Sequence, residues 1–321
     1  MQRPPEPWGP SASFETLRAR AVALARIRAF FTSRGVLEVD TPQLCPVGAT
    51  DPLLDSVTAE PFRDGRVWYL QTSPEFPLKR LLAAGSGPVY QLGKCFRRGE
   101  AGPRHNPEFT MLEWYRPGFD VDTLIDEVAE LVGELLPGLP LRRASYGELF
   151  LRHAGIDAFT ETEASLQAQA EALTPDAAGW DRDALLELLF SAQVEPHLGG
   201  GCLEVVTEFP ASRAALARTH RDARGHLVAA RFELFIRGLE IANGYDELGD
   251  AVELRRRFDA DNAARLDRGL EPMPVDERLL AAMVHGLPAC SGVALGVDRL
   301  LMVVLGKQRI DEVIAFGAER A

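Results

Sequence analysis

Side chains that can hold charged ligands are concentrated between residues 97 and 115 of this sequence. The segment begins with Arg97 and Arg98 and continues, after a Gly/Pro turn, to Arg104 and His105. A loop of clustered arginines suits a polyphosphate, because guanidinium groups donate paired hydrogen bonds to phosphate oxygens. We therefore expect this loop to bind the phosphates of a nucleotide.

An alternating segment follows the loop and predicts a strand. Because successive strand side chains point to opposite faces, Phe109, Met111, Glu113 and Tyr115 should share one face. A carboxylate among aromatic side chains is costly to bury unless a cation lies against it. The loop and the strand together predict a pocket for a nucleotide and a small cationic substrate.

The segment from residue 231 to residue 248 predicts a β-hairpin that turns at Arg237 and Gly238. In this register Leu234 pairs with Ile241. The same register decides which acidic side chains share a face of the hairpin.

Glu233 and Glu240 become diagonal neighbours on that face. Two carboxylates so close repel each other, and one takes up a proton unless a cation bridges them. Magnesium bound together with a nucleotide's phosphates is the natural cation. The alternative is a solvated face with two ordinary glutamates, and the basic loop leads us to favour the metal.

A third segment, residues 291–302, contains glycines and a conspicuous arginine. Gly292 and Gly296 permit a close approach of the backbone. Arg299 lies in the first turn of a predicted helix, where a lone cation opposes the helix dipole and so implies an anion such as a phosphate. The alternative is a surface arginine paired with Asp298.

The order of the expected elements predicts an α+β fold with an antiparallel sheet, because strands precede and follow a helical stretch and few βαβ units occur. Glu75 starts one helix and would by itself be a good helix start. Sequence patterns of P-loop, Rossmann and zincin sites are absent. The expected helices are 14–34 and 75–84, the expected strands are 36–39, 67–71, 88–96, 108–115, 202–209 and 231–243, a strand runs into a helix at 291–306, and 120–200 is mostly helical.

Composition narrows the class of protein further. The 321 residues are 46% apolar and carry a net charge of −12, which argues against non-specific nucleic-acid binding. Four widely spaced cysteines favour reduced thiols in a cytosolic protein. No signal peptide and no apolar run of transmembrane length are expected, so a membrane is not an expected partner.

These segments together resemble the catalytic core of class II aminoacyl-tRNA synthetases, most closely the lysyl type. Residues 38–42 resemble the first class motif, residues 96–115 the second and residues 292–299 the third. The resemblance extends from about residue 14 to the end of the chain and is weakest in residues 120–200. It implies an antiparallel sheet flanked by helices.

Lysyl-tRNA synthetases carry an anticodon-binding barrel before this core, whereas here the core begins almost at residue 14. The chain is therefore more similar to the stand-alone paralogues that attach (R)-β-lysine to a lysine of elongation factor P. The unbroken strings at 105–117 and 290–300 fit that family closely. The implied organisation is an N-terminal arm over 1–12 and a catalytic domain without the barrel over 13–321, with 120–200 as an insertion between the second and third motifs.

The resemblance implies how ATP is held. Arg97 would hold the α-phosphate and the substrate carboxylate, and Phe109 would stack on adenine with Arg299 on its other side reaching the γ-phosphate. Arg97 and Arg299 are thereby the expected catalytic residues, and Glu233 and Glu240 would hold Mg²⁺. The other expected ATP contacts are Arg98, Gly99, Glu100, His105, Asn106, Glu240, Ile241 and Gly296.

The resemblance also implies how the substrate is held. Ala294 stands where lysyl-tRNA synthetases usually have glycine, and its methyl group would favour β-lysine over α-lysine. Ser73 and Pro74 would line the same pocket. Glu75 would bind one substrate amine, Glu113, Tyr115 and Glu247 the other, and Asn243 the carboxylate.

The implied activity is an ATP-dependent ligation through an acyl-adenylate, with elongation factor P as acceptor and α-lysine as a weaker substrate. The first motif and the apolar stripe Leu17, Leu24, Ile27 and Phe31 imply a cytoplasmic homodimer. One alternative is a minimal lysyl-tRNA ligase, which the net charge disfavours. The other is a catalytically inactive, synthetase-like regulatory protein, and such proteins usually lose the site residues that stand here.

Overall fold

The computed structural model describes residues 8–321, and the chain divides into two compact units. The first unit combines residues up to Phe119 with Leu248–Ala321, and the second is Asp120–Glu247. The first seven residues of the expected N-terminal arm lie outside the described residues. Beyond them, Ser11 is held to the C-terminal segment, since its backbone N–H donates to the Ala315 carbonyl at 2.7 Å.

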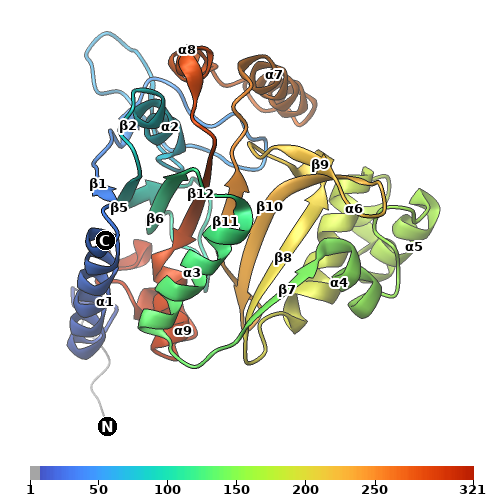
Figure 1. Ribbon diagram of the computed structural model, residues 1–321, viewed down its shortest axis with the longest axis horizontal. Coiled ribbons are helices and arrows are strands. Elements are labelled where there is room, and N and C mark those ends of the chain that lie inside the picture. Colours follow the sequence, from blue (N-terminus) through green and yellow to red (C-terminus); the bar gives the residue numbers. More distant parts are fainter. Residues whose placement is uncertain (1–7) are drawn as a thin grey trace. The chain divides into compact units, whose positions relative to one another are not determined.

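A mostly antiparallel sheet forms the centre of the first unit. β5 and β6 pair antiparallel, β6 and β12 pair antiparallel, and the short β1 joins β5 in parallel. Figure 1 shows β5 and β6 side by side. The strands of this unit are β1 (Leu37–Glu38), β5 (Val89–Phe96), β6 (Glu108–Pro117) and β12 (Cys290–Gly296), with a small second sheet of β2 (Leu44–Cys45), β4 (Trp68–Leu70) and β3 (Thr58–Ala59).

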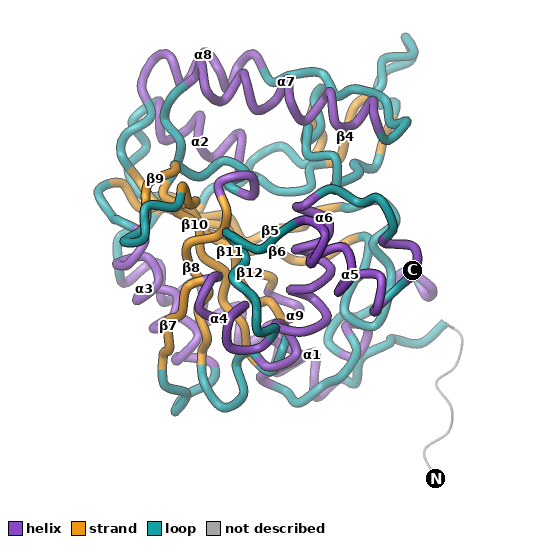
Figure 2. Tube along the Cα trace, turned by 90° about the vertical axis from the view of Figure 1, so that its right-hand side faces the viewer, coloured by secondary structure: helices purple, strands orange, loops and turns teal. Residues whose placement is uncertain are grey.

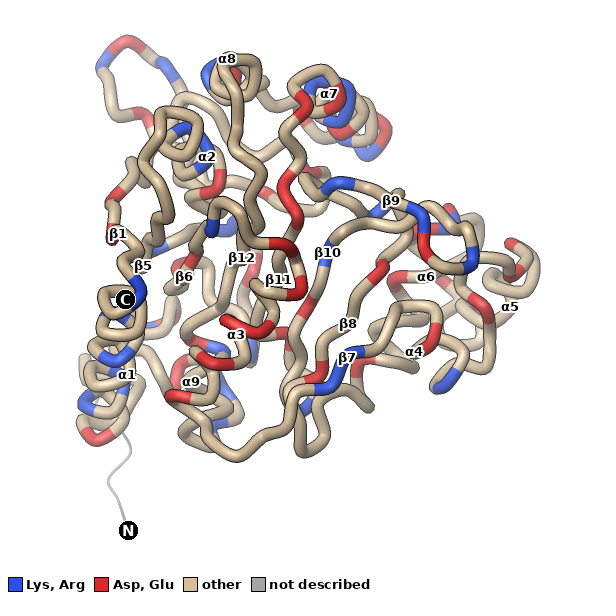
Figure 3. The backbone as a smooth tube through the Cα atoms, in the orientation of Figure 1, with Lys and Arg blue, Asp and Glu red and all other residues tan. Residues whose placement is uncertain are grey.

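Five α-helices accompany the sheets in the described part of the first unit. α9 packs against β6 and β12, and α2 packs against α8. α7 and α8 lie side by side (Figure 2), and acidic and basic positions are interspersed along α7 (Figure 3). The helices are α1 (Phe14–Ser33), α2 (Glu75–Ala83), α7 (Ala251–Asp267), α8 (Glu277–Gly286) and α9 (Val297–Val304).

The helix α1 begins where the sequence predicts and buries part of its apolar stripe in its own unit. The Ser13 side chain caps it by accepting from the Thr16 backbone N–H at 3.1 Å. Phe31 is fully buried and stacks on Tyr90 with ring centroids 4.4 Å apart. Ile27 is buried as well, so these two stripe residues belong to the core of the unit.

The central part of β6 is buried on both faces. Leu112 and Trp114 have no exposed area and lie on one face. The opposite face carries Met111, Glu113 and Tyr115, each at most 5% exposed. The predicted alternation along this strand is confirmed.

The second unit is a five-stranded part of the sheet with helices on it. β10 pairs antiparallel with β8 and β11, β7 pairs parallel with β8, and the short β9 pairs with β10. α3 packs against β10 and β11. The elements are α3 (Val121–Leu135), β7 (Leu141–Ser145), α4 (Tyr146–His153), α5 (Glu163–Leu173), α6 (Arg182–Leu189), β8 (Leu203–Pro210), β9 (Thr219–Arg221), β10 (Leu227–Ile236) and β11 (Leu239–Asp246).

One strand was missed in the stretch expected to be mostly helical. β7 has the sequence Leu-Arg-Arg-Ala-Ser, and only Ala144 within it is buried. A strand with a single buried side chain has no alternating pattern to detect, because its pairing with β8 rather than its own apolar face holds it in place.

The predicted turn of the hairpin is confirmed. Arg237 and Gly238 have φ angles of 54° and 65°, as a two-residue hairpin turn requires. Gly199 lies against this turn, since its carbonyl accepts from the Arg237 N–H at 2.9 Å. A Cβ on Gly199 would meet Ile236 Cα at 2.6 Å, so the close approach explains a glycine at this position.

The predicted register of the hairpin is only partly right. Phe235 pairs with Glu240 as expected, but Leu234 pairs with Ala242 instead of Ile241. A β-bulge therefore inserts one extra residue into β11 immediately after Glu240. The bulge shifts the alternation of all later side chains of this strand to the opposite face.

Both units combine antiparallel strand pairing with packed helices, and the α+β class expected from the sequence is confirmed. In the part of the chain that the structure describes, no helix combines the length and apolarity needed to cross a membrane.

Candidate active site

The arginine-rich loop leaves β5 and returns as β6 within the first unit. The Arg97 N–H donates to the Pro107 carbonyl at 2.9 Å, which closes the base of the loop. Gly99 adopts a φ of 78°, a conformation that favours glycine. The Arg97 guanidinium lies 5.0 Å from the centre of the Phe109 ring and 3.6 Å from Glu100. Three residues expected at the ATP site, Arg97, Glu100 and Phe109, therefore lie together.

The C-terminal segment fastens the tip of this loop. The Ile310 N–H donates to the Pro103 carbonyl at 2.7 Å, and the Ala318 N–H donates to Asn106 Oδ1 at 2.9 Å. Asn106 in turn donates to the Glu108 carbonyl at 2.6 Å. The side chain of Asn106 thus helps to hold the loop to the C-terminal segment, a role that the sequence motif does not predict.

The third segment brings a second arginine to the loop. β12 ends at Gly296, α9 begins at Val297, and Arg299 lies in its first turn as expected. An Arg299 terminal nitrogen lies 2.6 Å from His105 Nε2. Two predicted ATP-site residues, one on the loop and one on α9, are therefore in contact.

A buried carboxylate lies at the centre of β6. Glu113 is 2% exposed and accepts hydrogen bonds from Ser73 Oγ at 2.6 Å and from the Tyr115 hydroxyl at 2.7 Å. Ala294 is its direct cross-strand partner on β12, so its methyl group lies on the same face. We call Ser73, Glu75, Glu113, Tyr115 and Ala294 the amine cradle.

Burial raises the pKa of Glu113 to about 7, and the nearby charge of Glu75 contributes to the increase. The hydrogen bonds from Ser73 and Tyr115 oppose it, as does Lys79. A carboxyl poised near neutrality in a closed site is typical of functional positions. The cradle is therefore suited to a cation, which would hold the carboxylate in its charged form.

Glu75 is the first residue of α2, and Pro74 precedes it at the N-cap position. Its carboxylate accepts from Lys79 Nζ at 2.6 Å, one helical turn further on. Lys79 is fully buried, and sequence reasoning missed it. A lysine spaced four residues after a glutamate is a common surface pattern, so the sequence carries no signal that this pair is internal.

The second unit carries the predicted acidic pair. Glu233 is 7% exposed and accepts a hydrogen bond from Arg231, which lies on the same face of β10. Burial raises the pKa of Glu233 to about 7; Arg231 opposes this rise and the charge of Glu240 adds to it. The interaction between the two carboxylates supports the predicted shared face.

The bulge explains how a third predicted residue joins that face. Asn243 lies directly opposite Glu233 in the observed register. Its Oδ1 accepts from Arg231 Nε at 3.1 Å. Without the extra residue Ile241, the alternation of β11 would direct Asn243 away from the face that holds Glu240.

Glu247 follows β11 and is 1% exposed. Its backbone carbonyl accepts from Arg218 Nε at 3.0 Å, and it forms an isolated bridge with Ala217. The backbone around this acidic residue is therefore fixed from two sides.

The chemistry of the acidic pair fits a magnesium ion shared with phosphates. Within residues 8–321, no group of three or more His, Cys, Asp or Glu side chains has the arrangement of a metal site. Magnesium commonly takes one or two carboxylates and completes its shell with water and phosphate oxygens. Glu233 and Glu240, whose charges disfavour each other, meet that requirement.

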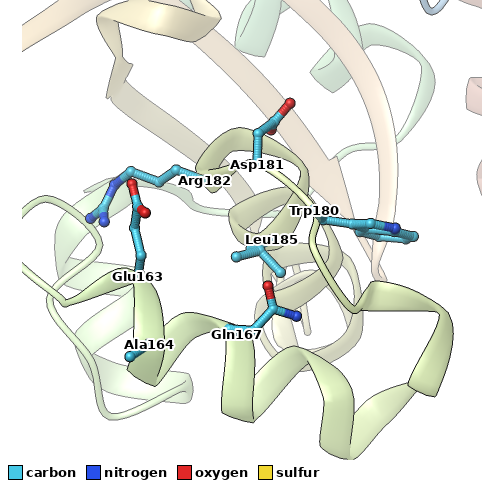
Figure 4. Close-up of a pocket in the computed structure, with 7 residues that line it drawn as sticks. All are labelled: Glu163, Ala164, Gln167, Trp180, Asp181, Arg182 and Leu185. Atoms are coloured by element: carbon cyan, nitrogen blue, oxygen red, sulfur yellow. The ribbon is translucent and has the colours of Figure 1, made fainter.

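A cavity of about 430 Å³ lies in the helical part of the second unit (Figure 4). Arg182, on its wall, donates to the carbonyls of Ala158 and Glu161, each at 2.8 Å. Gln167 donates to Glu171 and to the Ala177 carbonyl. These polar groups form hydrogen bonds between neighbouring segments of the second unit. We therefore interpret the cavity as a gap in helix packing rather than as a ligand site.

Comparison with known proteins identifies the family. The family model for class II tRNA synthetases (D, K and N) matches residues 10–320. The chain belongs to the class II tRNA synthetase family. It is 48% identical over 321 residues to the elongation factor P–(R)-beta-lysine ligase of Pectobacterium carotovorum, covering 98% of each chain. The ligases of the same name from Pasteurella multocida and Yersinia enterocolitica are 49% and 48% identical, and the match again covers 98% of this chain.

Membership of the class II synthetase family agrees with the geometry of the site. The family suggested by the three sequence segments is confirmed. The relatives match over at least 98% of their own length. The sequence-predicted site residues lie in both units, on strands, at helix starts and in the loop between β5 and β6.

Proposed function

We propose that this protein is an ATP-dependent ligase that activates (R)-β-lysine as an acyl-adenylate and transfers it to a lysine side chain of translation elongation factor P. The amine cradle is the main observation behind this proposal. In it, the buried carboxylate of Glu113 lies directly across the sheet from the methyl group of Ala294 and accepts a hydrogen bond from Ser73. The relatives are elongation factor P–(R)-beta-lysine ligases, which supports this substrate and this acceptor.

In the first step, a carboxylate oxygen of β-lysine attacks the α-phosphorus of ATP, and pyrophosphate leaves. The protein supplies position and charge rather than a nucleophile. We assign Arg97 to the α-phosphate, Phe109 to the adenine ring and Arg299 to the terminal phosphate. The contacts of Arg97 with Phe109 and of Arg299 with His105 support this assignment.

A magnesium ion, when bound, would neutralise phosphate charge, and we propose that Glu233 and Glu240 hold it. Asn243 would hold the substrate carboxylate, since Arg231 fixes the orientation of its amide. Further backbone and side-chain groups would complete the ATP site. They belong to Arg98, Gly99, Asn106, Ile241 and Gly296.

In the second step, the neutral amine of the acceptor lysine attacks the acyl carbon. The amide bond forms, AMP leaves with the electron pair of the broken bond, and the amine releases a proton. The energy of the adenylate drives this exchange, so the transfer needs no second ATP. A translation factor as acceptor places the proposed reaction in the cytoplasm.

The substrate amines are assigned to the acidic residues. Glu113, with Tyr115 and Glu247, would bind one ammonium group, and Glu75, beside Ser73 and Pro74, the other. We further propose that residues 13–321 act as one catalytic domain with 120–200 as an insertion, that α-lysine is a weaker substrate, and that the protein is a homodimer.

Exchange of labelled pyrophosphate into ATP, dependent on β-lysine, tests the activation step. Arg299→Ala should lower the exchange rate by roughly 10²–10³, the usual effect of removing one donor that stabilises transition-state charge. Arg309→Ala is the matched control, because Arg309 is exposed and pairs with Asp311 at the surface. Absence of exchange in the unaltered protein would instead indicate a regulatory protein, and an unchanged rate in Arg299→Ala would contradict the assigned role.

A further inference from the structure

A buried lysine side chain lies against the amine cradle. Lys79 lies on the inner side of α2, is 0% exposed and donates to Glu75 Oε1 at 2.6 Å. Burying an ammonium group is costly unless a carboxylate pairs with it. A buried cation is unexpected in a site that must itself attract an ammonium group, so its presence requires a reason.

The charges around Glu113 supply the reason. Glu75 disfavours the ionised form of Glu113 and Lys79 favours it. Within the first unit, the other groups that face Glu113 are neutral at pH 7. They are the hydroxyls of Ser73 and Tyr115 and the thiol of Cys95 on β5, since burial and the charge of Glu113 raise the pKa of that thiol. The first unit thus supplies two carboxylates and one ammonium, which leave one net negative charge, and Glu247, assigned to the same substrate ammonium, would add a second.

Without a fixed cation, the repulsion between two neighbouring carboxylates is relieved by protonation. A substrate ammonium would then have to displace a proton from Glu113, and binding would weaken towards low pH. The Lys79 ammonium limits this effect, because its charge holds the Glu113 pKa lower than the two carboxylates alone would allow. It also anchors Glu75 through one of its two oxygens.

We propose that Lys79 is a positioning residue of the amine cradle: its ammonium orients Glu75 and offsets its charge, so that Glu113 is ready to receive one substrate ammonium group. This role deepens the proposed function and rests on it for the identity of the substrate. Lys79 acts through Glu75 and Glu113 and need not touch the substrate.

Lys79→Met tests the role, because methionine is similar in length and fits a buried, uncharged position. Because the Glu113 pKa is about 7 in the unaltered protein, the KM for β-lysine in the exchange reaction at pH 7 should rise about fivefold for the first unit by which this pKa increases and about tenfold for each further unit. The rise should shrink at pH 8.5, and the KM for ATP should stay the same. A rise that is equal at all pH values, or that also affects ATP, would mean that Lys79 is only structural.

A second variant guards against misfolding and isolates the charge effect. Glu75→Gln combined with Lys79→Met removes both members of the ion pair, so neither charge is left buried alone. The midpoint of the pH profile should return towards that of the unaltered protein, even though loss of Glu75 raises the KM itself. A midpoint that stays at the value of Lys79→Met would overturn the proposal.

Titration of the Glu113 carboxyl by ¹³C NMR separates this inference from the proposed function, since it needs no substrate. Lys79→Met should raise the Glu113 pKa above that of the unaltered protein, whatever amino acid the enzyme uses. An unchanged Glu113 pKa would refute the inference while leaving the proposed ligase activity standing.

Discussion

Arg20 and Asp298, 278 positions apart in the chain, form an ion pair at 2.5 Å that joins α1 to α9. The second Asp298 oxygen accepts from the Thr110 N–H at 2.7 Å, and Arg20 also donates to the Thr110 hydroxyl. Asp298 precedes Arg299 and Thr110 follows Phe109. The pair thus fixes the spacing between the two side chains assigned to either side of adenine.

Removal of this pair should loosen the ATP site. Asp298 is 2% exposed, so Asp298→Asn should lower the free energy of unfolding by about 3–5 kcal/mol, as when one partner of a buried ion pair is lost. The KM for ATP should rise. Urea denaturation and exchange kinetics measure both effects. Asp311→Asn is the control, since its exposed pair with Arg309 should contribute about 0–1 kcal/mol.

Binding of β-lysine should strengthen between pH 6 and pH 8. Glu113 must be ionised to pair with an ammonium group, and its pKa is raised from 4.5 to about 7. Because the folded-state value lies above the ordinary one, this group's contribution to stability falls as pH rises from about 4.5 to 7. Binding and stability therefore change in opposite directions, which calorimetry at several pH values can show.

Glu113→Gln should remove this pH dependence and weaken β-lysine binding by about 2–5 kcal/mol, the cost of leaving a buried charge unpaired. ATP binding should stay the same. Glu204→Gln serves as the control, because Glu204 is also buried but accepts from the Gly199 N–H in the second unit. Equal loss of affinity for both ligands would indicate a structural role for Glu113.

Ala294→Gly should increase the use of α-lysine. The Ala294 methyl group lies beside Glu113, and moving the substrate amine by one carbon relocates the group that meets it. A one-carbon difference in a tight pocket changes kcat/KM by roughly 10–200-fold. The comparison is the ratio of kcat/KM for the two lysine isomers, with the KM for ATP as the internal control. An unaltered ratio would remove Ala294 from the specificity pocket.

The proposed homodimer should depend on the exposed apolar side chains near α1. Val22 and Leu37 are 55% and 56% exposed, whereas Ile27 and Phe31 of the predicted stripe are buried. Val22→Glu should produce monomers in sedimentation experiments at micromolar concentration. Val284→Glu is the control, since Val284 is 79% exposed on α8. If the unaltered protein is a monomer under the same conditions, the proposed homodimer is wrong.

The parts of the site that follow from local chemistry could be predicted from the sequence. Alternation placed Glu113 and Tyr115 on one face of β6, and the turn residues Arg237 and Gly238 located the hairpin. The bulge after Glu240 could not be predicted, because a single extra residue leaves the apolar pattern almost unchanged.

Residues whose role depends on packing escaped prediction for a different reason. Lys79 and Arg20 have the appearance of ordinary surface cations in the sequence. In the folded unit, however, Lys79 is itself buried beside Glu75, and Arg20 pairs with the buried Asp298. Similarly, β7 is held by its neighbour β8 and has little apolar pattern of its own.

The central claim concerns the acceptor, and a direct competition tests it. The protein is mixed with ATP, magnesium, (R)-β-lysine or α-lysine, and both tRNA and elongation factor P, and the products are weighed by mass spectrometry. We expect the mass of one β-lysine residue on a lysine of elongation factor P and none on tRNA. Mass added to tRNA but not to elongation factor P, or α-lysine outcompeting β-lysine, would contradict the account.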